Sequence, residues 1–163
     1  MYTTENEKNF IISHLKKSQK LLEYGSGSST ELLSQYVSEI TSVEHNLEWA
    51  KIVQDKNISN AKILYAPCDL PYIEGTEDDG SYFQFRTYIE CPLKYGKYDV
   101  IFIDGRARVE CVKFSKKLIT NPDCDIFVHD FFIRQNSGEN YKEMLNYAKI
   151  IDSVGQMCRL RIL

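Results

Sequence analysis

The fold is decided by Leu21-Leu22-Glu23-Tyr24-Gly25-Ser26-Gly27-Ser28-Ser29-Thr30-Glu31, near the start of the chain. A short apolar run passes through two glycines into a helical pattern, which predicts a strand, a tight loop and a helix. Glycine permits positive φ and a close approach of the backbone to a ligand. The first turn of the following helix exposes free N–H groups. The stretch therefore predicts a loop that holds a ligand.

After this stretch, short apolar runs alternate with amphipathic helical patterns along the rest of the chain. A parallel crossover needs a dozen or more residues, so this alternation predicts a parallel sheet covered on both faces. The last residues, 149–163, contain two strand-like pieces split at Gly155, which predicts a closing hairpin. The strands are expected at 21–24, 40–43, 62–65, 98–103 and 126–129, and the helices at 4–18, 30–37, 47–55, 109–119 and 141–148.

Composition favours one globular domain in a reducing compartment. The chain has 163 residues, with 43% hydrophobic and 26% charged residues, enough for one domain spanning 1–163 but not for two. The net charge of −3 argues against a nucleic-acid partner, and the sequence has no apolar run long enough to span a membrane. Five cysteines, an odd number, favour free thiols. We therefore expect a cytoplasmic protein that does not bind membranes; its oligomeric state is left open.

An acid follows the strand after the glycine loop. Glu44 closes the run Thr41-Ser42-Val43-Glu44-His45, where a carboxylate can accept both hydroxyls of a ribose. The loop and this acid together predict a nucleoside-containing ligand. The alternative is that Glu44 is an ordinary exposed acid at a helix start, favoured there by the helix dipole.

Two nucleoside ligands are compatible with this arrangement. A dinucleotide would bring its pyrophosphate to the loop, where an acid at the entrance, Glu23, would repel it. S-adenosylmethionine would instead bring an ammonium group, which Glu23 could face, and a carboxylate for the loop N–H groups. Thr30 also replaces the third glycine of the dinucleotide fingerprint. Both features favour the methyl donor over NAD.

Four segments occur in order along the chain: the glycine loop 23–30, the acid Glu44, the run Tyr98-Asp99-Val100-Ile101-Phe102-Ile103-Asp104-Gly105-Arg106 and the run Asp125-Ile126-Phe127-Val128-His129-Asp130. Together they resemble the successive motifs of class I S-adenosylmethionine-dependent methyltransferases. The resemblance covers residues 20–163. It implies a Rossmann-like three-layer α/β sandwich with a mostly parallel seven-stranded sheet of order 3-2-1-4-5-7-6, the last strand antiparallel.

The resemblance also implies which residues contact the donor. Glu23, Gly25 and Gly27 match the donor-binding loop, Glu44 matches the ribose acid, and Asp104 lies beside the expected methionine moiety. Asp69, in the loose match Ala66-Pro67-Cys68-Asp69-Leu70, stands where such enzymes often contact adenine. The expected cofactor site is completed by the neighbours of these positions, Tyr24, Ser26, Ser29 and His45.

Catalysis is expected at Asp104, His129 and Asp130, because they follow adjacent strands at the edge where open α/β sheets bind ligands. Two mechanisms fit. In metal-dependent O-methyltransferases, carboxylates at these places hold a divalent cation such as Mg²⁺, and Asp104 and Asp130 match two of them, although Phe131 stands where an Asn or Asp often follows. Alternatively, His129 or Asp130 is a general base without metal.

Arg106 and Arg134 are candidates for binding an anionic acceptor, and Tyr141 for lining its pocket or packing the last helix. The long stretch 67–97 interrupts the alternation, and within it residues 71–90 form either a lid or an acidic turn followed by a helix with packed aromatics. The sequence therefore predicts a methyltransferase for a small-molecule hydroxyl acceptor. The alternatives are a NAD-binding oxidoreductase and a non-catalytic module that binds a partner.

Overall fold

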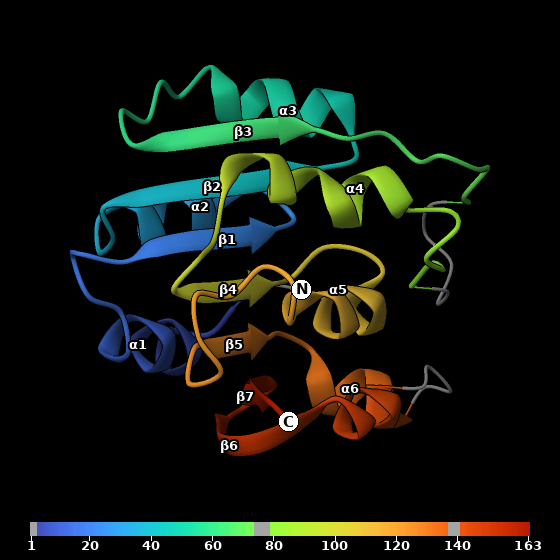
Figure 1. Ribbon diagram of the computed structural model, residues 1–163. Coiled ribbons are helices and arrows are strands. Elements are labelled where there is room, and N and C mark those ends of the chain that lie inside the picture. Colours follow the sequence, from blue (N-terminus) through green and yellow to red (C-terminus); the bar gives the residue numbers. More distant parts are fainter. Residues whose placement is uncertain (1–2, 74–78, 137–140) are drawn as a thin grey trace.

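The computed structural model describes residues 3–73, 79–136 and 141–163 (Figure 1). Their seven strands form one sheet of order β3-β2-β1-β4-β5-β7-β6, which confirms the predicted topology. The strands are β1 (Lys20–Tyr24), β2 (Glu39–Glu44), β3 (Ala61–Tyr65), β4 (Val100–Ile103), β5 (Asp125–Val128), β6 (Ala148–Val154) and β7 (Met157–Ile162). The helices are α1 (Glu5–Ser13), α2 (Ser28–Ser34), α3 (Leu47–Gln54), α4 (Arg86–Glu90), α5 (Arg108–Ser115) and α6 (Phe131–Asn136), with 3-10 helices at Cys91–Tyr95 and Tyr141–Asn146.

The first five strands are parallel and nearly in step. Tyr24 pairs with Val43 on one side and with Ile103 on the other, and Ile103 pairs with Val128. The residues that follow these positions therefore come together at one edge. Beyond β5, the hairpin β6–β7 adds antiparallel strands, and Gly155 makes its turn with φ +58°. This register is what assembles the site.

Two apolar layers hold the sheet. On one face, Ile11 of α1 and Leu33 of α2 pack with Leu21, Ile40 and Phe102. On the other face, α4 and α5 pack against the sheet, and Figure 1 shows α4 in front of β2 and β1. Both faces of the central strands are buried, as the sequence predicted from their continuous apolar runs. The edge strand β3 differs, since none of its residues is fully buried.

The stretch that interrupts the alternation is anchored by aromatic residues. Phe85, Tyr88 and Ile89 are fully buried, so α4 belongs to the core, which matches the alternative of a helix with packed aromatics. Phe83 is 72% exposed. Residues 74–78, in the middle of the 71–90 segment, lie outside the described residues, and a lid there stays a prediction.

Two elements near the C-terminus differ from expectation. The helix expected at 141–148 is a 3-10 helix that ends at Asn146, and α6 was not predicted. Both helices are short, so neither contains the extended run of apolar residues with a 3.6-residue period from which a helix is recognised in a sequence. Among the described residues, no helix is long and apolar enough to cross a membrane.

Candidate functional site

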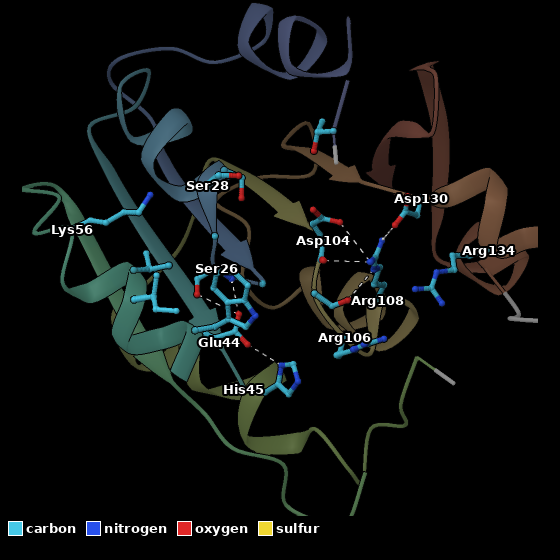
Figure 2. Close-up of a pocket in the computed structure, with 18 residues that line it drawn as sticks. Ser26, Ser28, Glu44, His45, Lys56, Asp104, Arg106, Arg108, Asp130 and Arg134 are labelled. Carbon is cyan, nitrogen blue, oxygen red and sulfur yellow. Dashed lines mark hydrogen bonds and ion pairs between the residues drawn. The ribbon is translucent and has the colours of Figure 1, made fainter. Parts of the chain in front are cut away.

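A cavity of about 560 Å³ opens at the carboxyl ends of β1, β2, β4 and β5 (Figure 2). Its size is in the range of small-molecule and cofactor sites. One part is formed by the glycine loop and α3, and the other by the residues after β4 and β5. The described lining residues are Thr3, Gly25 to Ser29, Glu44, His45, Trp49, Ile52, Val53, Lys56, Asp104, Gly105, Arg106, Arg108, Asp130 and Arg134.

The two glycines of the loop have different roles. Gly25 has φ +96°, and a Cβ there would stand 2.6 Å from the Cα of Gly105, so β1 and β4 can approach only without that atom. A Cβ on Gly27 would meet nothing within 4 Å. Because Gly27 lines the cavity, its missing side chain leaves room for a ligand rather than for the protein's own backbone.

Glu44 is held in place at the end of β2. Its Oε2 accepts hydrogen bonds from the backbone N–H and the hydroxyl of Ser26, and Oε1 accepts from the N–H of Asn46 and lies 3.0 Å from Nδ1 of His45. Burial acts to raise the pKa of Glu44, but these hydrogen bonds outweigh it and lower that pKa. The cavity therefore contains a fixed, ionised carboxylate beside the glycine loop.

An apolar wall stands next to Glu44. Trp49 and Ile52 of α3 line the cavity and are 53% and 50% exposed. His45 lies on the same side, with its ring against Phe85 and Tyr88. Trp49 and Ile52 were not predicted as site residues, although their spacing of three residues on the helix after the acid puts both on one face. Large apolar side chains left open beside a carboxylate suit a flat, partly polar ligand such as a nucleoside.

Glu23 does not take the position that the sequence suggested. It is fully buried and is not among the described residues that line the cavity; its carboxylate accepts hydrogen bonds from the hydroxyls of Ser29, Thr30 and Ser42. Burial raises its pKa to about 7, against the effect of these hydroxyls. A carboxylate turned toward α2 and β2 cannot face a ligand's ammonium group, so the electrostatic argument against a pyrophosphate does not hold.

A pH-dependent contribution to stability follows from Glu23. Its pKa is about 7 in the folded protein and 4.5 ordinarily, so between these values the folded state binds a proton that the unfolded state releases. The wild-type free energy of unfolding should therefore fall by up to about 3 kcal/mol from pH 5 to pH 8 relative to that of Glu23→Gln. Urea unfolding at several pH values measures the difference.

Glu44→Gln is the matched control, because the lowered pKa of Glu44 places its titration below this window. Its difference from wild type should stay constant between pH 5 and pH 8. A constant difference for Glu23→Gln as well would mean that Glu23 is ionised in the folded protein throughout this range.

Asp104 and His129 form a pair at the ends of β4 and β5. Nδ1 of His129 lies 3.0 Å from Oδ1 of Asp104, while its Nε2 lies 3.7 Å from Glu7 of α1. Burial acts to lower the pKa of His129, but Asp104 and Asp130 outweigh it and raise that pKa. His129 is 1% exposed and is not among the described lining residues, whereas Asp104 lines the cavity. His129 therefore contacts Asp104 from behind the described lining of the cavity.

Arg108, at the start of α5, lies among three acids. Its guanidinium is 3.4 Å from Asp130, 3.5 Å from Asp104 and 4.0 Å from Asp79. Asp79 also accepts a hydrogen bond from the backbone N–H of Arg108. From the sequence, Arg108 was interpreted only as capping or solvating a helix face, because its partners come from three separate segments. Arg108 is 5% exposed and joins these acids into one network, in which Asp104 is partly exposed to the cavity.

Two further arginines line the same part of the cavity. The guanidinium of Arg106 lies 5.5 Å from the ring centre of Tyr72, in a cation–π contact. Within the described parts of the chain, Arg106 has no carboxylate at ion-pair distance, and Figure 2 shows its side chain between His45 and Arg134. This region can therefore receive an anionic group.

The residues expected to hold a divalent cation do not fit one. Asp104, His129 and Asp130 offer ligand atoms within 4.8 Å of one another. However, Oδ1 of Asp104 is already bound by His129 and Arg108, and Oδ2 of Asp130 by Arg108. The oxygens that remain, Oδ2 of Asp104 and Oδ1 of Asp130, would hold a divalent ion beside the charged guanidinium of Arg108. The chemical roles proposed for this site therefore belong to the chain's own side chains.

Comparison with known proteins rests on structure, since no family model matches the sequence and no curated protein does. A methyltransferase-like protein from Silicibacter pomeroyi has a TM-score of 0.80 at 19% identity, over 99% of this chain and 87% of that one. A putative methyltransferase from Streptococcus mutans in complex with SAH has a TM-score of 0.60 at 9% identity, over 100% of both chains. The tRNA (m1A58) methyltransferase from Aquifex aeolicus has a TM-score of 0.62 at 14% identity, over 99% of this chain and 70% of that one.

The strand order decides between the two nucleotide-binding folds. Dinucleotide-binding domains have the order 3-2-1-4-5-6, whereas here an antiparallel strand is inserted between β5 and β6. The chain has the class I methyltransferase fold.

Within this methyltransferase fold, the cavity brings together most of the predicted site residues. Five of the predicted residues lie elsewhere. Two of them, Glu23 and His129, are described above. Tyr24 is buried and its hydroxyl donates a hydrogen bond to the carbonyl of Ile89, and Tyr141 is buried against Phe131. Asp69 accepts hydrogen bonds from the N–H and the hydroxyl of Thr87. The predicted residues that do line it are Gly25, Ser26, Gly27, Ser29, Glu44, His45, Asp104, Arg106, Asp130 and Arg134.

Proposed function

We propose that the protein is an S-adenosylmethionine-dependent methyltransferase. The observation that carries this proposal is the cavity at the carboxyl edge of a methyltransferase-type sheet, with the ionised Glu44 and the open position at Gly27 side by side. When bound, S-adenosylmethionine supplies a methyl group on a positively charged sulfur. The roles below are those of the chain's own residues.

Donor binding falls to the glycine loop and α3. Glu44 can accept the two ribose hydroxyls, because its carboxylate is already fixed by the N–H groups of Ser26 and Asn46. Trp49 and Ile52 offer an apolar surface to the adenine ring. Gly27 leaves space for close approach to the backbone. These features support a ligand that joins adenosine to an amino acid.

Acceptor activation falls to Asp104. Its Oδ1 is held by His129 and Arg108, and Oδ2 has no hydrogen bond to any described residue. A carboxylate fixed in this way can take the proton of a hydroxyl as the new carbon–oxygen bond forms. Asp130 lines the same region but is 7% exposed, so Asp104 is the stronger candidate for the base. We therefore propose O-methylation first and N-methylation second.

Arg106 favours an acceptor that carries a negative group, since its guanidinium lines the cavity without an ion pair to a described residue. We propose a small molecule. One structural neighbour is a tRNA methyltransferase, so RNA belongs in the same assay, although the net charge of −3 counts against it. Transfer of the labelled methyl group from S-adenosylmethionine to a panel of hydroxy acids, phenols and bulk RNA tests the proposal.

Glu44 provides a specific test of donor binding. Glu44→Gln should weaken S-adenosylhomocysteine binding by about 10–100-fold, because a neutral amide loses charge-assisted bonds worth about 1.5–3 kcal/mol. Titration calorimetry measures the change. Glu48→Gln, the same replacement on the exposed start of α3, should bind like wild type. Equal affinity for all three proteins would remove Glu44 from the site.

A NAD-binding oxidoreductase is the second candidate, although the strand order is not that of dinucleotide-binding domains. Glu23 is buried away from the cavity, so its carboxylate would not repel a pyrophosphate bound at the glycine loop. Hydride exchange between NADH and a carbonyl substrate, followed at the nicotinamide absorbance, would support that candidate instead.

A further inference from the structure

Arg108 is the most enclosed cation of the site and has no part in the binding roles above. Its guanidinium donates to three backbone oxygens, those of Gly105, Asp104 and His129. Those carbonyls fix the plane of the guanidinium, and its outer edge lies against carboxylates. Burial acts to lower the pKa of Arg108, but Tyr141 and the neighbouring carboxylates outweigh it and raise that pKa, so the charge is retained.

This guanidinium bridges the two acids that follow β4 and β5. Its Nη2 lies 3.5 Å from Oδ1 of Asp104, and its Nη1 lies 3.4 Å from Oδ2 of Asp130. Figure 2 shows Arg108 between these two side chains. A divalent ion held by the same carboxylates would need oxygens at about 2.0–2.6 Å. It would then stand against a fixed positive charge with little water to screen it.

The charges of the cluster are consistent with a single resident cation. The guanidinium of Arg108 lies within 4.0 Å of the carboxylates of Asp79, Asp104 and Asp130. Buried carboxylates need such partners, since an unpaired buried charge is strongly destabilising. The sequence around Asp104 and Asp130 alone resembles a metal site because it contains the acids but gives no sign of the cation between them.

We propose that Arg108 takes the place of a divalent metal ion in this site, bridging Asp104 and Asp130 and holding Asp104 toward the cavity. The protein then binds no catalytic metal, and Arg108 is a positioning residue that acts through Asp104. This inference concerns the chain's own charges and does not depend on which group is methylated.

Manganese binding tests the proposal without any activity assay. Wild-type protein titrated with Mn²⁺, followed by the loss of the free-ion electron paramagnetic resonance signal, should show no saturable site up to about 1 mM, the weak end of specific divalent-cation sites. Arg108→Met removes the guanidinium and should gain a site at least tenfold tighter. Arg106→Met, which removes a cavity arginine that does not bridge the acids, should gain none.

Arg108→Met leaves Asp79 without its ion pair. If this variant does not fold, the double variant Asp79→Asn with Arg108→Met replaces it. A saturable site in the wild type that Asp104→Asn abolishes would overturn the proposal. So would a folded Arg108→Met or double variant that binds no Mn²⁺. If neither variant folds, the wild-type titration decides, since the absence of a site supports the proposal.

Discussion

Asp104→Asn lowers the rate of methyl transfer by about 10²–10⁴-fold, the usual contribution of a general base, while leaving donor affinity nearly unchanged. The amide keeps the oxygen that accepts from His129, so the local structure is preserved. It loses the basic oxygen that faces the cavity. Single-turnover transfer to the acceptor identified in the panel measures the rate, and calorimetry with S-adenosylhomocysteine measures the affinity.

Asp69→Asn is the matched control for this prediction. The chemical change is the same, but Asp69 is bound to Thr87 and lies outside the described cavity lining. Its rate of transfer should equal that of wild type. An unchanged rate for Asp104→Asn, or an equal loss in both variants, would contradict the assignment of Asp104 as the base.

The second large effect separates the two glycines of the loop. Gly27→Ala should weaken S-adenosylhomocysteine binding by about 5–150-fold, since a methyl group forced into a filled site costs about 1–3 kcal/mol. Its melting temperature should match that of wild type, because the added Cβ meets nothing in the protein itself. Calorimetry and thermal unfolding without ligand measure the two quantities.

Gly25→Ala should behave in the opposite way. Its positive φ and the 2.6 Å approach to Gly105 predict a loss of about 2–5 kcal/mol of folding free energy, from left-handed backbone strain and overpacking together. If Gly27→Ala were as unstable as Gly25→Ala, or bound ligand like wild type, the cavity beside Gly27 would not be the donor site.

The fold was predictable because its signals are local. The apolar runs, the glycine loop and the turn at Gly155 each specify one element, and the rules for parallel crossovers then leave few ways to connect them. Glu44 and Asp104 were also predictable, since the residue that follows a parallel strand lies at the ligand-binding edge whatever the rest of the chain does.

The orientation of individual side chains was not predictable, because it depends on residues distant in the sequence. Glu23 turns away from the cavity because a hydroxyl from the next strand, that of Ser42, and two from α2 bind it. Asp69 is taken by Thr87, whose position depends on how α4 packs. Nothing in the local sequence of either acid indicates these partners.

The same reason explains the metal site that was expected. Asp104 and Asp130 were identified from their places after two strands, but the cation between them comes from the first turn of α5, and Asp79 reaches it from another loop. A cluster of acids can be inferred from sequence, whereas the side chain that neutralises it becomes visible only in three dimensions.

Ligand-dependent thermal stability shows whether the cavity binds adenosine joined to an amino acid. At about 100 times its dissociation constant, S-adenosylhomocysteine should stabilise the protein by about 2.7 kcal/mol and raise the melting temperature by about 5–10 °C. NADH at the same concentration should leave it unchanged. Stabilisation by NADH with none from S-adenosylhomocysteine would contradict the claim.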